Sequence, residues 1–72
     1  MEDLKELEEI IGRNVKAKRL ELGLSISEVA KASGVSRYSV RQLESGKHNS
    51  RLNIFAAIAE ALGMSGPELF KK

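Results

Sequence analysis

Apolar residues recur along the chain with the three- and four-residue spacing of one helix face, and no stretch longer than a few residues alternates like a strand. Leu4, Leu7 and Ile11 show this spacing near the start, and Phe55 and Ile58 show it in the most apolar stretch. The pattern predicts an all-α domain with five helices. These run from about Asp3 to Leu22, from Ser25 to just before Gly34, from Ser36 to about Ser45, from Leu52 to Leu62, and from Ser65 onward.

Serines and glycines mark the predicted helix ends. Ser25 and Ser65 each precede a glutamate by three residues, the S-x-x-E capping box in which two side chains satisfy the first free amides of a helix. Asp3 and Glu6 form a weaker D-x-x-E version at the start of the first helix, and Gly12 is a point where that helix could bend or break. Left-handed glycines are expected to end four helical stretches, at Gly23, Gly34, Gly46 and Gly63.

The second and third predicted helices are separated by only three residues, from Gly34 to Ser36. A turn this short that contains a glycine sets two helices at about 90–120°, the helix-turn-helix arrangement. Ala30 is small where a larger side chain would push the helices apart, and Val40 and Leu43 are expected to face inward at the crossing. The plainer alternative is a helical hairpin within a bundle.

With Val40 and Leu43 inward, the opposite face of the third helix carries four side chains suited to base recognition: Arg37, Tyr38, Arg41 and Gln42. Arginine can donate two hydrogen bonds to guanine, glutamine can pair with adenine, and an aromatic ring can pack on the thymine methyl group. A solvated face is the alternative, because arginine and glutamine are common on exposed helices. No carboxylate lies between Glu28 and Glu44 to pair with these cations, which favours DNA binding.

The charge distribution indicates an anionic partner for the middle of the chain. The 72 residues carry a net charge of +2, but residues 1–10 carry −4, residues 11–51 carry +6 and residues 52–72 carry none. The length suits one small domain. We therefore predict a single domain over residues 1–72 whose first ten residues form an acidic helical extension.

Composition argues against most other function classes. The chain has no cysteine and a single histidine, His48, so it offers no thiolate or paired-histidine metal site and no nucleophile with a general base. Its glycines are too far apart for a phosphate-binding loop. We predict no enzyme activity, cofactor, metal or small-molecule substrate. No apolar run approaches the roughly 18 residues of a membrane span, so we expect a cytoplasmic protein without membrane association.

Four segments carry a resemblance to a known family: KRLELGLS, EVAKASGVS, LESGK and AIAEALGMS. Residues 11–70 resemble the Cro/cI (XRE-type) helix-turn-helix domain of lambdoid phage repressors and many bacterial regulators. The resemblance implies a compact five-helix, lambda-repressor-like domain that binds double-stranded operator DNA as a homodimer on a two-fold site. It also implies a sequence-specific, repressor-like transcriptional regulator whose third helix, about residues 36–45, enters the major groove.

The resemblance assigns roles to individual residues as well. Arg37, Tyr38, Arg41 and Gln42 would sit where the family reads bases. Arg19 and Glu44 match a largely buried ion pair that joins the first and third helices. The positions that would lie near DNA phosphates are Ser25, Ser27, Ser36, Ser39, Lys47, Asn49 and Arg51.

Some features depart from the family. Ile26 stands where many members carry a glutamine that bonds a phosphate and braces the third helix, so it is expected to leave an apolar spot facing DNA or a partner. Ser50 stands where a proline is usual, and the acidic residues 1–10 are not explained by the family. The expected dimer surface is the C-terminal end, around Met64 to Phe70, the alternative being that its apolar residues complete the core.

The main alternative function is a protein-interaction module of the same fold, such as an antitoxin or an antagonist of another regulator. An antitoxin would keep its DNA face and hold a toxin elsewhere, whereas an antagonist would lose DNA binding. Ile26 is the residue that supports the antagonist. Binding to duplex DNA that weakens steeply with salt distinguishes a regulator from either, because release of counterions from phosphates drives such binding.

Overall fold

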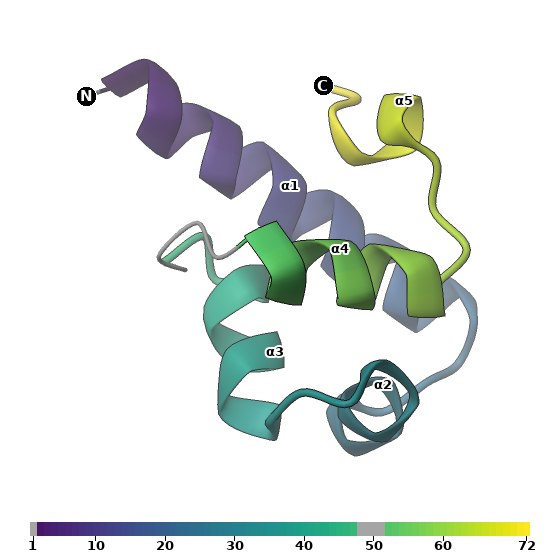
Figure 1. Ribbon diagram of the computed structural model, residues 1–72. Helices are drawn as coiled ribbons and strands as arrows, with labels where there is room; N and C mark the ends of the chain where they lie inside the picture. Colours follow the sequence, from purple (N-terminus) through teal and green to yellow (C-terminus); the bar gives the residue numbers. More distant parts are fainter. Residues whose placement is uncertain (1, 48–51) are drawn as a thin grey trace.

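Five helices make up the described part of the chain, and no strand occurs in it (Figure 1). The computed structural model describes residues 2–47 and 52–72, with side chains at 5–47 and 53–72. The helices are α1 (Glu2–Glu21), α2 (Ile26–Ser33), α3 (Arg37–Glu44), α4 (Leu52–Ala61) and α5 (Gly66–Leu69). The all-α fold predicted from the spacing of the apolar residues is confirmed.

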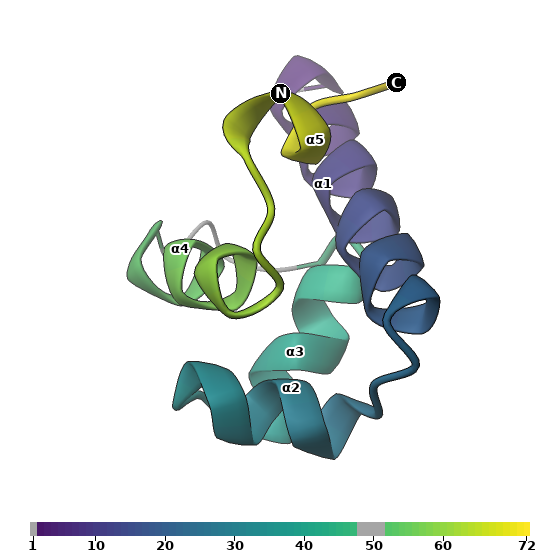
Figure 2. The ribbon, with the colours of Figure 1, turned by 90° about the vertical axis from the view of Figure 1, so that its right-hand side faces the viewer.

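The core lies where the inward faces of α1, α2, α3 and α4 meet, and Leu69 of α5 closes it. Its fully buried side chains are Val15, Val29, Val40, Leu43 and Ile58. Figure 2 shows α2 and α3 at one end of the molecule and α5 beside α1 toward the other end. The hydrophobic spacing therefore directs one face of each long helix inward, which leaves the outer face of α3 free.

Helix α1 is continuous through Gly12, so the chain does not break at the point where the sequence allowed it. A Cβ atom at Gly12 would clash with the carbonyl oxygen of Leu43 and lie 3.0 Å from that of Glu44. Gly46, with a φ of 76°, meets α1 in the same way, since a Cβ there would lie 3.1 Å from the Cα and Cγ atoms of Glu9. Gly12 is thus present for close packing of α1 on the end of α3, and the acidic extension continues the same helix.

Serine caps begin the three shorter helices that follow the predicted turns. Ser25 Oγ accepts from the amide of Glu28 at 3.0 Å, and the Ser25 amide donates to Glu28 Oε1 at 2.8 Å. Ser65 forms the equivalent capping box with the third residue of α5. Both predicted boxes are confirmed, whereas Asp3 lies inside α1, which begins at Glu2, two residues before the first helical position that the D-x-x-E pattern indicated.

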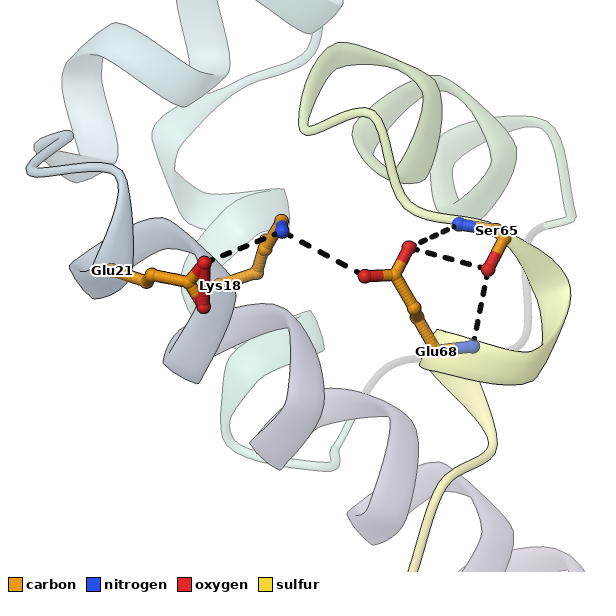
Figure 3. A network of polar contacts seen from close by, with 4 residues as sticks. All are labelled: Lys18, Glu21, Ser65 and Glu68. Carbon is orange, nitrogen blue, oxygen red and sulfur yellow. Dashed lines mark hydrogen bonds and ion pairs between the residues drawn. The ribbon is translucent and has the colours of Figure 1, made fainter.

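Polar contacts hold α5 against α1. Lys18 Nζ lies 3.7 Å from Glu68 Oε2 and 3.5 Å from Glu21 Oε2, as Figure 3 shows. Hydrogen bonds from Ser65, first from its amide and then from its hydroxyl, lower the pKa of Glu68. Asn14 Nδ2 donates to the carbonyl oxygens of Leu69 at 2.7 Å and Lys71 at 2.8 Å. A single α1 side chain therefore fastens the backbone of the chain end.

Two apolar residues of the C-terminal surface expected to form a dimer contribute to the core. Leu69 is 7% exposed, and Met64 packs partly against the core. Phe70 is 46% exposed and is the large apolar side chain of this segment that remains accessible. Leu69 and Met64 therefore fit the alternative interpretation, in which the apolar residues of this segment complete the core.

Candidate nucleic-acid interface

The turn between α2 and α3 has the geometry of a glycine-ended helix. Gly34 adopts the left-handed conformation, with φ 74° and ψ 20°, and its amide donates to the carbonyl oxygen of Ala30 at 2.9 Å. The amide of Val35 donates to the same oxygen at 3.1 Å. A residue with a Cβ rarely adopts this φ, so Gly34 allows the chain to leave α2 and enter α3 within three residues.

Packing at this turn fixes which side of α3 faces outward. Val29 and Val40 are completely buried, and Leu43 is 1% exposed. Ala30 is 6% exposed, in keeping with its predicted place at the helix crossing. Because successive residues of a helix are about 100° apart around its axis, the remaining side chains of α3 are directed toward solvent.

The four predicted base-reading residues lie together on this outer side. Arg37 and Arg41 are exposed, and Tyr38 is 70% exposed. Gln42 is half-buried, one turn after Tyr38. The face thus presents two guanidinium groups, a phenol and a carboxamide in a single helical surface of eight residues, a combination of hydrogen-bond donors and an acceptor that matches base edges in a major groove.

The start of α3 is closed by Ser36. Its hydroxyl oxygen accepts from the amide of Ser39 at 3.0 Å, and the hydroxyl donates to Ser39 Oγ at 3.0 Å. The hydroxyl hydrogen of Ser39 remains available to an outside acceptor, since Ser39 Oγ acts as an acceptor here. Of these two predicted phosphate-contacting serines, Ser39 is therefore the one with a hydrogen left to donate.

The other predicted phosphate contacts lie around α3. Ser25 and Ser27 are exposed at the start of α2, and Lys47 is exposed just past the end of α3. The Ser25 oxygen accepts the capping bond from the amide of Glu28. Hydrogen bonds from the Ser25 amide, and then from its hydroxyl, lower the pKa of Glu28. Asn49 and Arg51 lie outside the described residues, as do His48 and Ser50.

A buried ion pair joins α1 to α3. Arg19 Nε lies 2.6 Å from Glu44 Oε2, Nη2 lies 3.1 Å from Oε1, and Nη1 donates to the carbonyl oxygen of Leu24 at 2.9 Å. The side chains of Arg19 and Glu44 are 10% and 7% exposed. The hydrogen bond with Glu44 raises the pKa of Arg19, so the guanidinium group stays protonated at any ordinary pH.

This pair also affects the charge of the outer face. Glu44 is the only carboxylate of α3, and its pairing with Arg19 directs it inward. Arg37 and Arg41 form no ion pair within residues 5–47 and 53–72. The outer side of α3 therefore carries positive charge that no neighbouring carboxylate neutralises. Such a surface attracts the negatively charged phosphates of DNA.

Ile26 is less exposed than its departure from the family suggested. It is half-buried and packs against the core alongside Leu24 and Val35. The side chain that replaces the family's glutamine thus serves packing of α2, because the first turn of α2 lies close enough to the core to cover it. The antagonist alternative, which rested on Ile26, is therefore weakened.

Three positioning residues escaped the sequence interpretation. Gly12 and Gly46 allow α1 to contact the backbone at the end of α3, and Asn14 fastens the chain end. A glycine inside a helix made of good helix formers was the available signal for Gly12, since such a glycine usually has a packing reason.

No helix within residues 2–47 and 52–72 is both long and apolar enough to cross a membrane. The same residues contain no group of acidic or histidine side chains that could hold a metal ion.

Comparison with known proteins places this geometry in a family. Residues 15–69 match the helix-turn-helix family model. The chain is 34% identical over 64 residues to the uncharacterized HTH-type transcriptional regulator y4dJ of Sinorhizobium fredii, a match that covers 89% of this chain and 83% of the relative. The crystal structure of the clp gene regulator ClgR from C. glutamicum is similar with a TM-score of 0.80 and 30% identity, covering 89% of this chain and 82% of that one.

The chain therefore belongs to the helix-turn-helix family, of the XRE type. It is a DNA-binding transcriptional regulator and not an enzyme. The family and the functional class predicted from the four sequence segments are thereby confirmed.

Proposed function

We propose that the protein recognises a specific DNA sequence by inserting α3 into the major groove. Arg37, Arg41 and Gln42 donate or accept hydrogen bonds at base edges, and Tyr38 packs on a neighbouring base. The observation that carries this proposal is the outer side of α3, where these side chains gather while its only carboxylate is turned inward to Arg19.

Phosphate contacts surround this face in the proposed complex. The contacts to the two backbones of the duplex come from Ser27 at the start of α2, Ser39 at the start of α3 and Lys47 beyond its end, with Asn49 and Arg51 following Lys47 in the sequence. Ser25 and Ser36 cap these two helices at the same surface. The exposed start of α2 supports this arrangement, because amides and hydroxyls at a helix N-terminus attract phosphate oxygens. Such contacts fix the register of α3 without reading bases.

The protein acts as a repressor-like homodimer on a two-fold operator. One α3 spans a few base pairs, which are too few to define a unique binding site. Two copies together read half-sites whose centres lie about 34–36 Å apart. The chain works as one DNA-binding domain in the bacterial or phage-infected cytoplasm, where the operator DNA is accessible.

The test is selection of bound sites from random duplexes, followed by electrophoretic shifts of the selected site over a salt series. We expect a two-fold consensus and a log affinity that falls with log salt, with a slope of about −0.9 per neutralised phosphate. A consensus without symmetry refutes the dimeric operator. Binding that is absent or insensitive to salt refutes the DNA interface.

Two substitutions separate the two kinds of contact. Gln42→Ala is expected to relax preference at one base pair and to cost about 1–3 kcal/mol on the selected site. Lys47→Ala is expected to weaken all sequences equally and to reduce the salt slope by about 1. Lys16→Ala, which removes an exposed lysine of α1, is the control for loss of charge alone. A base-selective effect of Lys47→Ala, or unchanged affinity of Gln42→Ala, contradicts the assignment concerned.

A further inference from the structure

The acidic extension of α1 meets the end of α3 beside a residue assigned to phosphate contact. Gly46 is buried, and a Cβ atom built on it would lie 3.1 Å from both the Cα and the Cγ atom of Glu9. Lys47 follows Gly46 directly and is exposed. Because consecutive Cα atoms are about 3.8 Å apart, the carboxylate of Glu9 lies within about 10 Å of the Lys47 backbone. A negative charge of α1 is thus placed at the edge of the proposed DNA interface.

Glu9 carries a charge that no cation neutralises by direct contact in the part of the chain that the structure describes. Its side chain is exposed and forms no ion pair with any described side chain. Lys5 and Arg13, one turn before and one turn after Glu9 on α1, are exposed and form no ion pair with it. Lys47 also forms no ion pair with a described side chain. Both opposite charges therefore act on a ligand that approaches the end of α3.

Backbone packing fixes the position of Glu9 relative to α3. Helix α1 is continuous from Glu2 to Glu21, so Glu9 is part of a rigid element. The end of α3 lies against the middle of α1 (Figure 2), and the contact passes through Gly12 and Gly46, which have no side chains to rearrange. The carboxylate therefore stays near the end of α3 while the protein is folded.

A negative charge at this place opposes the binding of DNA phosphates. Attraction between phosphates and cations such as Lys47 supplies the part of the affinity that does not depend on sequence. The Debye length is about 10 Å at 0.1 M salt, so salt screens the effect of Glu9 on a phosphate at Lys47 only in part. A unit charge at such a distance changes binding by about two- to fivefold at low salt.

We propose that Glu9 limits the affinity of this protein for DNA of any sequence, because its carboxylate repels the phosphate that Lys47 contacts. The proposal rests on the proposed function, since it requires Lys47 to lie at the duplex backbone. It gives the acidic extension a role that the base contacts of α3 do not share. Weaker attraction to unrelated DNA leaves more of the protein free to reach its operator.

The experiment measures binding of the full chain to the selected duplex and to an unrelated duplex over a salt series. Glu9→Gln keeps the length of the side chain and removes its charge, so it is expected to bind both duplexes about two- to fivefold more tightly near 0.05 M salt. The gain should shrink as salt rises, because salt screens the repulsion in the wild type. Glu9→Asp keeps the charge and should bind like the wild type.

Two controls separate this effect from a general change of charge. Glu60→Gln removes an exposed carboxylate from the last turn of α4, and it should change the affinity less than Glu9→Gln does. In a Lys47→Ala background, the gain from Glu9→Gln should fall to less than about half, because the repelled phosphate is no longer held there.

Several results would overturn the proposal. These are a Glu9→Gln variant that gains no more than Glu60→Gln, a gain that is equal with and without Lys47, and a Glu9→Asp variant that binds as tightly as Glu9→Gln. Wild-type binding that is absent or insensitive to salt would instead overturn the DNA interface itself. The failure of the proposal and the failure of the proposed function are therefore distinct.

Discussion

The buried pair between Arg19 and Glu44 permits a quantitative prediction. Glu44→Gln keeps the shape of the side chain but replaces a carboxylate oxygen near Arg19 by an amide that also carries hydrogens. The guanidinium, with its side chain 10% exposed, would then keep only its bond to Leu24 and half of its contacts with residue 44. Removing one partner from a buried pair costs about 3–5 kcal/mol, because the other charge stays buried without compensation.

That cost is large for a chain of this length. A domain of 72 residues is stable by only about 0.05–0.15 kcal/mol per residue. At about 4–8 °C per kcal/mol, the melting temperature should fall by about 12 °C or more. Arg19→Met should cost at least as much, since it also leaves the carbonyl oxygen of Leu24 without its partner.

The assay is urea and thermal unfolding of the single variants and of Arg19→Met/Glu44→Leu. The double variant should regain most of the lost stability, because replacing both charges by apolar groups leaves neither one stranded. Lys18→Met is the matched control, since its ion pairs at 3.5 and 3.7 Å lie at the surface and should contribute at most about 1 kcal/mol. A Glu44→Gln variant within about 1 kcal/mol of the wild type would refute the reasoning.

Two further predictions concern the supports of the fold. Gly12→Ala should lower the free energy of unfolding by about 1–3 kcal/mol despite the better helix propensity of alanine, because the added Cβ atom meets the carbonyl oxygen of Leu43. Urea unfolding measures this change, and a variant more stable than the wild type would contradict the prediction. Capping hydrogen bonds lower the pKa values of Glu28 and Glu68, so their stabilisation is present above the ordinary glutamate pKa of 4.5 and is lost as the pH falls through the lowered values. The gap in melting temperature between wild type and Glu28→Gln should therefore close on acidification, and a gap that does not depend on pH would be the contrary result.

Local features of the fold were accessible from the sequence. The caps at Ser25, Ser36 and Ser65 and the left-handed turn at Gly34 depend on bonds between residues three or four positions apart. The exposure of Arg37 and its neighbours follows from helix periodicity once the inward side of α3 is known. Such interactions need no knowledge of the rest of the chain, which is why their prediction succeeded.

Features that depend on distant partners were not accessible. The role of Gly12 requires the carbonyl groups of Leu43 and Glu44, more than thirty positions away, and Asn14 bonds to Leu69 across 55 positions. The packing of Ile26 against the core likewise depends on how α2 meets α4, and periodicity within α2 does not report it. The sequence marked Gly12 and Ile26 as unusual and gave no sign of the role of Asn14, and the partners of all three residues became visible only in three dimensions.

The contact at Gly12 has a consequence for how new specificities could arise on this scaffold. Because α1 touches the end of α3 through backbone atoms, no rotamer of an intervening side chain sets their separation. The packing that holds α3 in place therefore does not depend on the side chains that α3 exposes to solvent. Exchanging Arg37, Tyr38 or Arg41 for other types should alter which sequence is read without repacking the interior, so the surface of α3 can be grafted or evolved as an interchangeable part.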